Sequence, residues 1–289
     1  ANAFTTDTIL AFTDKGNYLY VPVHELPDLK WKELGKHISN IIPILQEEKI
    51  IEAIPIKEFD NNREITIFTK NGMTKKSMLE DFKVQRYTKS MSYIKLKDDD
   101  EVVNATIASE NQAIFLLTND GFVNFYPISA ISKQGIRASG VKGIALKGES
   151  KLVSMLCVHP LSKDTIFMAC EQGGFKHMRI SDVPVTNRAV KGVQIYKPVK
   201  SNPQSFMGAY LCKKEHYLQL FNQNDEIMKV EYKELPTQGL DTRLTTTNKQ
   251  KITFVYNSFF NKEEDMEIVQ VLDEPEVHFE TLSLDDFLN

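Results

Sequence analysis

The chain has 289 residues, of which 42% are hydrophobic and 26% are charged. This composition is ordinary for a folded globular protein, and the length allows one large β domain or two smaller domains. No apolar run approaches the roughly 20 residues that a membrane-spanning helix needs, so we expect no membrane partner. The chain opens in a strand-like run without Met or a signal pattern, and we therefore expect a piece of a longer polypeptide.

The net charge of −4 is unevenly distributed along the chain. Residues 262–289 contain one Lys against ten Asp and Glu, whereas residues 1–261 contain 34 Lys and Arg against 29 Asp and Glu. The segment from Lys70 to Lys97 holds eight cationic residues, opposed only by Glu80 and Asp81. A mildly basic body therefore precedes an acidic end, and much of this charge is expected on the solvated surface.

In chain order, the first predicted element is a β-hairpin at residues 7–27, DTILAFTDKGNYLYVPVHELP. An apolar run, a tight turn containing Gly16 and a returning strand make up this unit, because glycine tolerates the positive φ of such turns. The hairpin recurs, with a blurred turn in the fifth copy and a lengthened turn in the sixth. The later copies lie at residues 64–82, 113–131, 165–183, 217–235 and 267–287.

The spacing of these hairpins is regular. Their turn positions are Gly16, Gly72, Gly121, Gly173 and Asp225, which are 56, 49, 52 and 52 residues apart. Ten residues after each turn comes an apolar residue that is expected to end the hairpin. These residues are Leu26, Phe82, Ile131, Val183 and Leu235.

Between hairpins, the sequence predicts two further short strands. The expected pairs are 41–45 with 50–56, 93–96 with 102–107, 143–146 with 152–156, and 193–196 with 206–211. Four short strands in each unit of about 50 residues, without helical periodicity, are typical of a propeller. We predict a single all-β domain over residues 1–289. Its approximate repeats are 7–56, 57–107, 108–158, 159–211, 212–260 and 261–289.

Six hairpins but only five intervening strand pairs leave the last unit short. The chain stops two residues after Phe287. We therefore expect an open or incomplete seam between the first and last blades.

The repeat resembles the C-terminal domain of the A subunit of bacterial type IIA topoisomerases. Those domains open with an apolar run, F-T-x-x-G and a strand ending in an apolar-Pro step, as residues 7–27 do. The linkers RASGVKGIALKGESKLVSML (137–156) and NRAVKGVQIY (187–196) are also similar to the family's pattern. WD-type repeats fit poorly, because Trp31 is the single tryptophan and no W-D step occurs. The resemblance implies a six-bladed β-pinwheel, in which neighbouring blades exchange strands.

Within this family, DNA gyrase A subunits carry a basic Q-R-R-G-G-K-G box after the first hairpin. Here residues 30–37 read KWKELGKH, in which only Gly35-Lys36 matches and Glu33 brings a negative charge. This departure favours the topoisomerase IV branch. Two alternatives stay open: a gyrase wrapping domain with a degenerate box, and a protein-interaction propeller whose cations are incidental.

The resemblance also implies a role. The domain would bind and bend duplex DNA and position segments for decatenation and supercoil relaxation, without catalytic residues, metal site or cofactor of its own. Cleavage would belong to an N-terminal breakage-reunion domain of the same chain. ATP and Mg²⁺ would be used by the holoenzyme, in which an ATPase B subunit completes an A2B2 heterotetramer. We expect a bacterial, cytoplasmic and chromosome-associated location, and the three cysteines, without a C-x-x-C pair, agree with a reducing compartment.

Lysine and arginine side chains are the candidates for contact with phosphates, which a protein can hold without reading bases. We expect DNA to follow repeats one to four, with the acidic end off the path. The candidate residues are Lys36, His37, Lys75, Lys76, Lys83, Arg86, Lys89, Lys133, Arg137, Lys142, Lys176, Arg179, Arg188 and Lys191.

Overall fold

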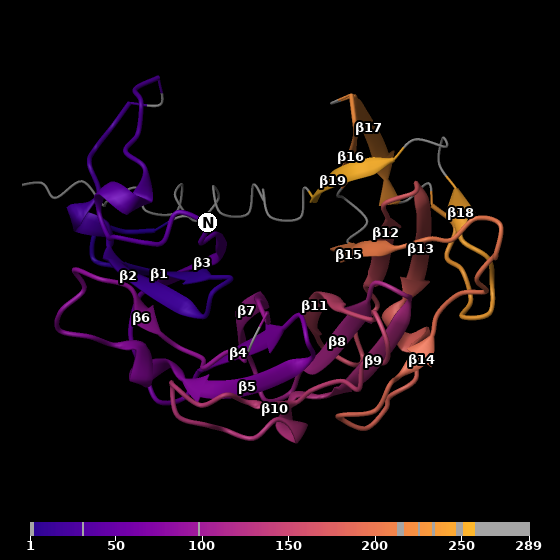
Figure 1. Ribbon diagram of the computed structural model, residues 1–289, viewed down its shortest axis with the longest axis horizontal. Coiled ribbons are helices and arrows are strands. Elements are labelled where there is room, and N and C mark those ends of the chain that lie inside the picture. Colours follow the sequence, from indigo (N-terminus) through magenta and orange to yellow (C-terminus); the bar gives the residue numbers. More distant parts are fainter. Residues whose placement is uncertain are drawn as a thin grey trace, which may run out of the picture.

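The computed structural model describes residues 3–30, 32–97, 99–212, 217–224, 226–232, 235–246 and 251–257. They form five small antiparallel sheets, the blades, arranged side by side in an open arc (Figure 1). Blade 1 and blade 5 lie at the two ends of this arc. The all-β expectation is confirmed for the described residues, whose helical turns are short 3-10 segments.

Each blade is built around one of the predicted hairpins. The first strands are β1 (Thr8–Thr13), β4 (Glu64–Thr69), β8 (Ala113–Thr118), β12 (Thr165–Cys170) and β16 (Tyr217–Asn222). The second strands are β2 (Asn17–Pro22), β5 (Met73–Met78), β9 (Phe122–Pro127), β13 (Gly174–Arg179) and β17 (Ile227–Glu231). On the inner side of the arc, the first strand pairs with the third strand of its own repeat (Figure 1). These third strands are β3 (Ile50–Ile56), β7 (Val102–Ala108), β11 (Leu152–Val158), β15 (Phe206–Cys212) and β19 (Ile252–Asn257).

The fourth strand of each complete blade comes from the following repeat. It has two residues and pairs with the second strand on the outer side of the arc: β6 pairs with β2, β10 with β5, β14 with β9 and β18 with β13. These exchanged strands are β6 (Met91–Ser92), β10 (Val141–Lys142), β14 (Val193–Gln194) and β18 (Thr245–Thr246). This is the strand exchange that the resemblance implied.

Turn glycines make the exchange sterically feasible. Gly16, Gly72, Gly121 and Gly173 all have φ near +80°, which is unfavourable for other residues. The carbonyl of Gly72 also accepts a 2.8 Å hydrogen bond from the amide of Gly143 in the next repeat. A Cβ on Gly72 would lie 3.0 Å from the carbonyl oxygen of Ile144. Glycine is therefore needed both for the turn and for the close approach of the next repeat.

The predicted apolar stops end short 3-10 turns that follow the second strands. Phe82, Ile131 and Val183 are buried there. The turns are η1 (Val23–Glu25), η3 (Leu79–Phe82), η4 (Ile128–Ala130) and η5 (Ile180–Asp182).

The hydrophobic core is divided into separate clusters between neighbouring blades. One cluster joins blades 1 and 2 through Phe12, Tyr18, Phe82 and Tyr93, whose rings pack mainly edge to face. Strands β4 and β8 are buried at every position, because blades cover both of their faces. Each blade therefore depends on its neighbours for burial of its apolar side chains.

The first repeat differs from the others in its second half. We expected a strand at 41–45, but the structure has η2 (Ile38–Asn40) followed by irregular chain. Ile42, with Ile38, Ile41 and Ile44 beside it, packs on Leu19 and its apolar neighbours at the end face of blade 1 and buries them. Since no blade precedes blade 1 in the described arc, these residues cap its face instead of pairing with another sheet.

The predicted strands at 93–96, 143–146 and 193–196 are also corrected. Exchange pairing involves only residues 91–92, 141–142 and 193–194. The apolar residues that follow, such as Tyr93 and Ile144, are buried between blades and do not continue the ladder.

The predicted number of six blades is corrected to five for the described residues. Blade 5 has three strands, in the order β17-β16-β19, and the outer edge of β17 has no paired strand among them. A fourth strand would have to come from the next repeat, and the sixth copy lies outside the described residues. The expected seam between the first and last blades involves the sixth repeat and therefore also lies outside the described residues.

We predict that Gly192→Ala weakens the attachment of β14 to blade 3. Gly192 has φ +83°, and a Cβ there would lie 2.2 Å from the carbonyl oxygen of Val123. The free energy of unfolding should fall by about 3 kcal/mol in urea denaturation. Gly148→Ala is the matched control, because Gly148 has φ +59° with no atom within 4 Å. It should cost about 1 kcal/mol, and equal costs for the two variants would contradict the close-approach explanation.

Candidate nucleic-acid interface

Strand exchange creates a set of loops on the outside of the arc. After the hairpins of blades 2 to 5 the chain crosses from its own blade to the blade before it, and we call these segments the crossing loops. They are residues 83–90, 132–140, 184–192 and 236–244, which lead to β6, β10, β14 and β18. Because the exchanged strands line the outer side of the arc, the crossing loops together form what we call the outer rim (Figure 1).

Three crossing loops are fixed to their blades by the same backbone hydrogen bond. The amides of Gln134, Thr186 and Gln238, spaced by one repeat, donate to carbonyls four residues after the turn glycine of the blade. The distances are 2.8 Å to Lys76, 2.6 Å to Phe125 and 2.7 Å to His177. Equivalent positions of each loop are therefore held at equivalent places on successive blades.

Half of the fourteen predicted residues lie exposed on or beside the outer rim. Repeat 2 contributes three in a single crossing loop, which crosses onto blade 1, and repeats 3 and 4 contribute the others. The exposed residues are Lys83, Arg86, Lys89, Lys133, Arg137, Lys142 and Arg179. A duplex lying along the rim would meet cationic side chains from one blade after another.

Some of the rim cations already have partners within the protein. Lys133 forms a 2.5 Å ion pair with Glu64. Arg188 is half-buried and donates from Nε to the carbonyl of Ala130 at 2.9 Å, and also to the carbonyl of Lys142. The ammonium of Lys191 lies 3.5 Å from the centre of the Phe122 ring, a cation–π contact. These contacts stabilise the loops. They also occupy hydrogen-bonding or charged groups of these cations that could otherwise contact phosphates.

Three of the predicted cations are inside the blades. The structure places Lys75, Lys76 and Lys176 at 0–2% exposure, so their side chains are not part of the rim surface. Lys76 forms a 2.9 Å buried ion pair with Glu64. Although burial opposes it, hydrogen bonds from Lys133 and Lys76 hold the pKa of Glu64 below its ordinary value. The sequence signal of paired lysines on the returning strand therefore reflects internal contacts of the blade.

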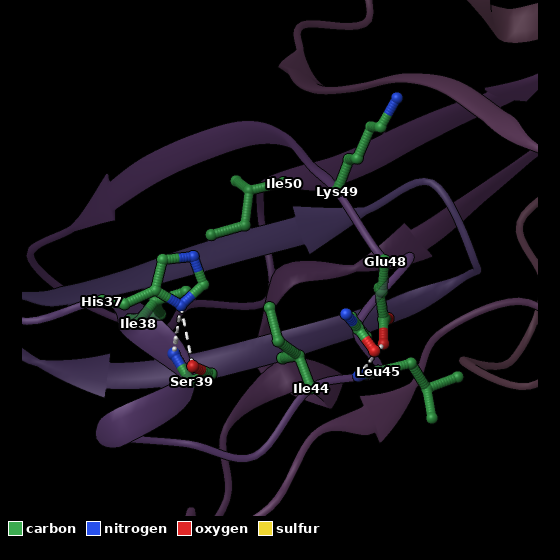
Figure 2. A pocket seen from close by; sticks show the side chains of 9 residues that line it. His37, Ile38, Ser39, Ile44, Leu45, Glu48, Lys49 and Ile50 are labelled. Carbon is green, nitrogen blue, oxygen red and sulfur yellow. Dashed lines mark hydrogen bonds between the residues drawn. The ribbon is translucent and has the colours of Figure 1, made fainter.

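Lys36 and His37 lie on the loop of the first repeat, at the open end of the arc. Both are exposed, and Nδ1 of His37 lies 2.7 Å from Oγ of Ser39 (Figure 2). This loop borders a hollow of about 690 Å³ beside Ile44, Leu45 and Glu48. The loop does not cross onto another blade in the described arc, so these two residues are separate from the outer rim.

The buried carboxylate of the hollow is bound within the protein. It belongs to Glu48, whose Oε1 accepts hydrogen bonds from Thr13 at 2.5 Å and Asn17 at 2.9 Å. Oε2 accepts from the amide of Leu45 at 3.2 Å. The carboxylate therefore fixes the base of the loop to the first hairpin turn.

Arg243 was missed by the sequence reasoning. It is exposed in the fourth crossing loop, just before β18, and stands one repeat beyond Lys191. The predicted DNA path over repeats one to four did not include the fifth repeat, whose returning strand alternates lysine with glutamate. Strand exchange, however, places this repeat's loop on blade 4, and the repeat register would have identified it.

Neither a metal-binding cluster nor a membrane-spanning helix is found among the described residues. Within that part of the chain, no three or more His, Cys, Asp or Glu side chains gather closely enough to hold a metal ion. In the same residues no helix has the length and apolar character that crossing a membrane requires. Cys170 and Cys212 are buried, Cys157 is half-buried, and all three are free thiols.

Hairpin blades whose fourth strand comes from the next repeat, arranged in an arc with a cationic outer rim, define a β-pinwheel. A family model for the DNA gyrase C-terminal domain, a β-propeller, matches residues 7–57, 63–109, 112–159 and 164–205, which correspond to blades 1 to 4. The chain belongs to this family, as the hairpin repeat predicted.

Its relatives place it nearer to topoisomerase IV than to gyrase. It is 37% identical over 267 residues to the A subunit of DNA topoisomerase 4 from Bacillus subtilis (strain 168), covering 92% of this chain and 31% of the relative. The chain thus spans about a third of that protein. The crystal structure of the C-terminal domain of DNA topoisomerase IV superimposes with a TM-score of 0.85 and 34% identity, covering 92% of this chain and 84% of that one. The structure of the DNA gyrase A C-terminal domain shares the fold, with a TM-score of 0.71, 19% identity, and coverage of 88% and 83%.

The buried amine of Lys176 predicts a specific pH dependence of stability. Burial lowers its pKa to about 8 in the folded protein, from an ordinary value of 10.5. Between these values the unfolded chain binds more protons, so this group's contribution to stability rises with pH. The free energy of unfolding of the wild type should therefore increase relative to Lys176→Met between pH 7.5 and 9.5, measured by urea denaturation. A difference that is constant or falls with pH would contradict this, and the comparison cancels the opposite contribution of the buried cysteines, whose pKa is raised.

Proposed function

We propose that this chain is the DNA-positioning C-terminal domain of a topoisomerase IV A subunit. It would hold duplex DNA along the outer rim of blades 1 to 4 through phosphate contacts, without reading bases. The observation that supports this most directly is the recurrence of cations in the crossing loops: Arg86, Arg137 and Arg243 are exposed in the first, second and fourth loops, and the third loop carries two half-buried cations. Family membership and the topoisomerase IV relatives support the same role.

The curvature of the outer rim supports a role in bending DNA. Because the blades form an arc, a duplex that contacts several crossing loops must follow a curved path. Bending a 20–30 base-pair site by 40–90° costs roughly 1–6 kcal/mol, so several phosphate contacts have to offset the cost. Cations distributed over four loops supply such contacts at separated points along the path. The acidic residues 262–289 would repel DNA and limit the path to the first four blades.

The rest of the enzyme would supply the chemistry. In this proposal cleavage belongs to an N-terminal breakage-reunion domain of the same polypeptide, and ATP hydrolysis, with Mg²⁺, to a B subunit in an A2B2 heterotetramer. The domain would act in the bacterial cytoplasm on the chromosome, presenting DNA segments for decatenation and relaxation. Residues 30–37 lack the arginines and paired glycines of the gyrase box, which favours bending over chiral wrapping.

Binding to duplex DNA should depend strongly on salt. If about six phosphates are neutralised, log K should fall with log salt at a slope near −5. Fluorescence anisotropy with a 30 base-pair duplex between 50 and 200 mM salt would measure the slope. Weak binding with no salt dependence would reject the proposal and favour a protein-interaction propeller.

Reversing the charge of one crossing loop should weaken binding selectively. Changing Lys83, Arg86 and Lys89 to Glu should lower affinity at least tenfold and make the salt slope shallower by about 3, one for each lost phosphate contact. A matched control changes three exposed lysines outside the crossing loops. These are Lys57, Lys163 and Lys200. Equal losses in the two variants would show that the rim is not the DNA path.

The linking number of closed circular DNA distinguishes the proposed bending from gyrase-like wrapping. With closed circular DNA and a nicking-closing enzyme, the chain should leave the linking number nearly unchanged when it only bends DNA. A large shift of one sign would instead indicate chiral wrapping, and would contradict the interpretation of the missing box.

A further inference from the structure

Blades 2, 3 and 4 each carry a buried polar side chain at the same position of the second strand. The residues are Lys75, Asn124 and Lys176, each three positions after its turn glycine. All three have 0% exposure. Each side chain reaches the backbone of the crossing loop that arrives from the next repeat.

The two lysines bind corresponding carbonyls. Nζ of Lys75 donates to the carbonyls of Gly135 at 2.9 Å and Ile136 at 2.7 Å. Nζ of Lys176 donates to the carbonyls of Gly239 at 2.6 Å and Leu240 at 3.1 Å. It also donates to Oγ1 of Thr242 at 2.8 Å. The same contact is therefore formed twice, two repeats apart.

In blade 3 the side chain and the loop differ together. Asn124 donates from Nδ2 to the carbonyl of Val190 at 3.3 Å and accepts a hydrogen bond from Thr186. The loops facing lysine read Gln-Gly-Ile at 134–136 and Gln-Gly-Leu at 238–240, whereas the loop facing Asn124 reads Thr-Asn-Arg at 186–188. The strand residue and the loop that faces it thus differ together between blade 3 and blades 2 and 4. This joint difference indicates that the two act as a pair.

A buried ammonium is costly unless it is hydrogen-bonded. The two lysines meet this requirement only when the loop carbonyls are in place, so each fixes its crossing loop to the blade. Directly after the bound segments come two exposed rim cations, Arg137 after Ile136 and Arg243 after Thr242. The orientation of both arginines therefore depends on the buried contacts.

We propose that Lys75 and Lys176 are positioning residues for the DNA path. They hold the crossing loops so that Arg137 and Arg243 face the outer rim, and they do not touch DNA themselves. This inference rests on the proposed function of the rim. Two of the cations that the sequence assigns to DNA contact thus act on DNA through the arginines of the next repeat.

A double-mutant cycle on the 289-residue chain tests the coupling. Lys75→Met and Arg137→Ala should each weaken binding to a 30 base-pair duplex by about fivefold, on the order expected for one lost phosphate contact. The double variant should bind no more weakly than Arg137→Ala alone, because the lysine acts through the arginine. The same cycle with Lys176→Met and Arg243→Ala is an independent repetition. Single effects that multiply in the double variants would overturn the proposal.

Hydrogen exchange provides a second measurement that does not need DNA. Lys75→Met should increase amide exchange in residues 134–142 while leaving 238–246 unchanged, and Lys176→Met should do the reverse. A global increase in exchange from either variant would show a general structural role and overturn the proposal.

A rescue variant covers the case in which Lys75→Met does not fold. Lys75→Asn with Gln134→Thr copies the Asn124–Thr186 pair of blade 3 and should recover both affinity and loop protection relative to Lys75→Asn alone. Failure to recover either property would contradict the paired role. Absence of DNA binding by the wild type would overturn the proposed function and this inference together, whereas normal wild-type binding with multiplicative effects would overturn the inference alone.

Discussion

The pairing of two residues from each repeat with the second strand of the preceding blade is the interaction on which the structure depends. It joins neighbouring blades, which also contact one another through separate apolar clusters and through hydrogen bonds between repeats. The glycine turn makes it possible, because a Cβ on Gly16 would lie 2.9 Å from the carbonyl oxygen of Ile94 in the next repeat. Each of these repeats therefore supplies the outermost strand of the preceding blade, and this exchange links the blades along the arc.

The same exchange organises the candidate interface. A chain segment that must reach the preceding blade has to cross the outside of the arc, and so four loops become exposed at regular intervals. The cations within these loops lie on the curved outer rim, where they could contact successive phosphates of one duplex. Buried lysines beneath two of the loops connect the packing of the blade to the surface above it. Fold stability and the geometry of the rim thus rest on the same contacts.

The two ends of the arc show what the exchange requires. Blade 1 has no preceding neighbour among the described residues, and residues 38–44 cover its free face with isoleucines. Among the described residues blade 5 has three strands, and a fourth, by the same exchange, would come from the sixth repeat, which lies outside them. The first repeat's loop, with Lys36 and His37, therefore lies apart from the rim, although its sequence position is equivalent to that of the other crossing loops.

The sequence by itself determined the hairpins of the five described blades, their spacing and the family, because glycine turns and apolar stops at fixed spacing are local signals. It also located the third strands to within about two residues, and most of the exposed rim cations. Only the tertiary structure decided the number of blades in the described chain, the burial of Lys75, Lys76 and Lys176, and the place of Arg243 on the rim. The physical reason is that strand exchange brings together segments from different repeats. Whether a lysine meets solvent, a carboxylate or a carbonyl then depends on the neighbouring repeat rather than on its own.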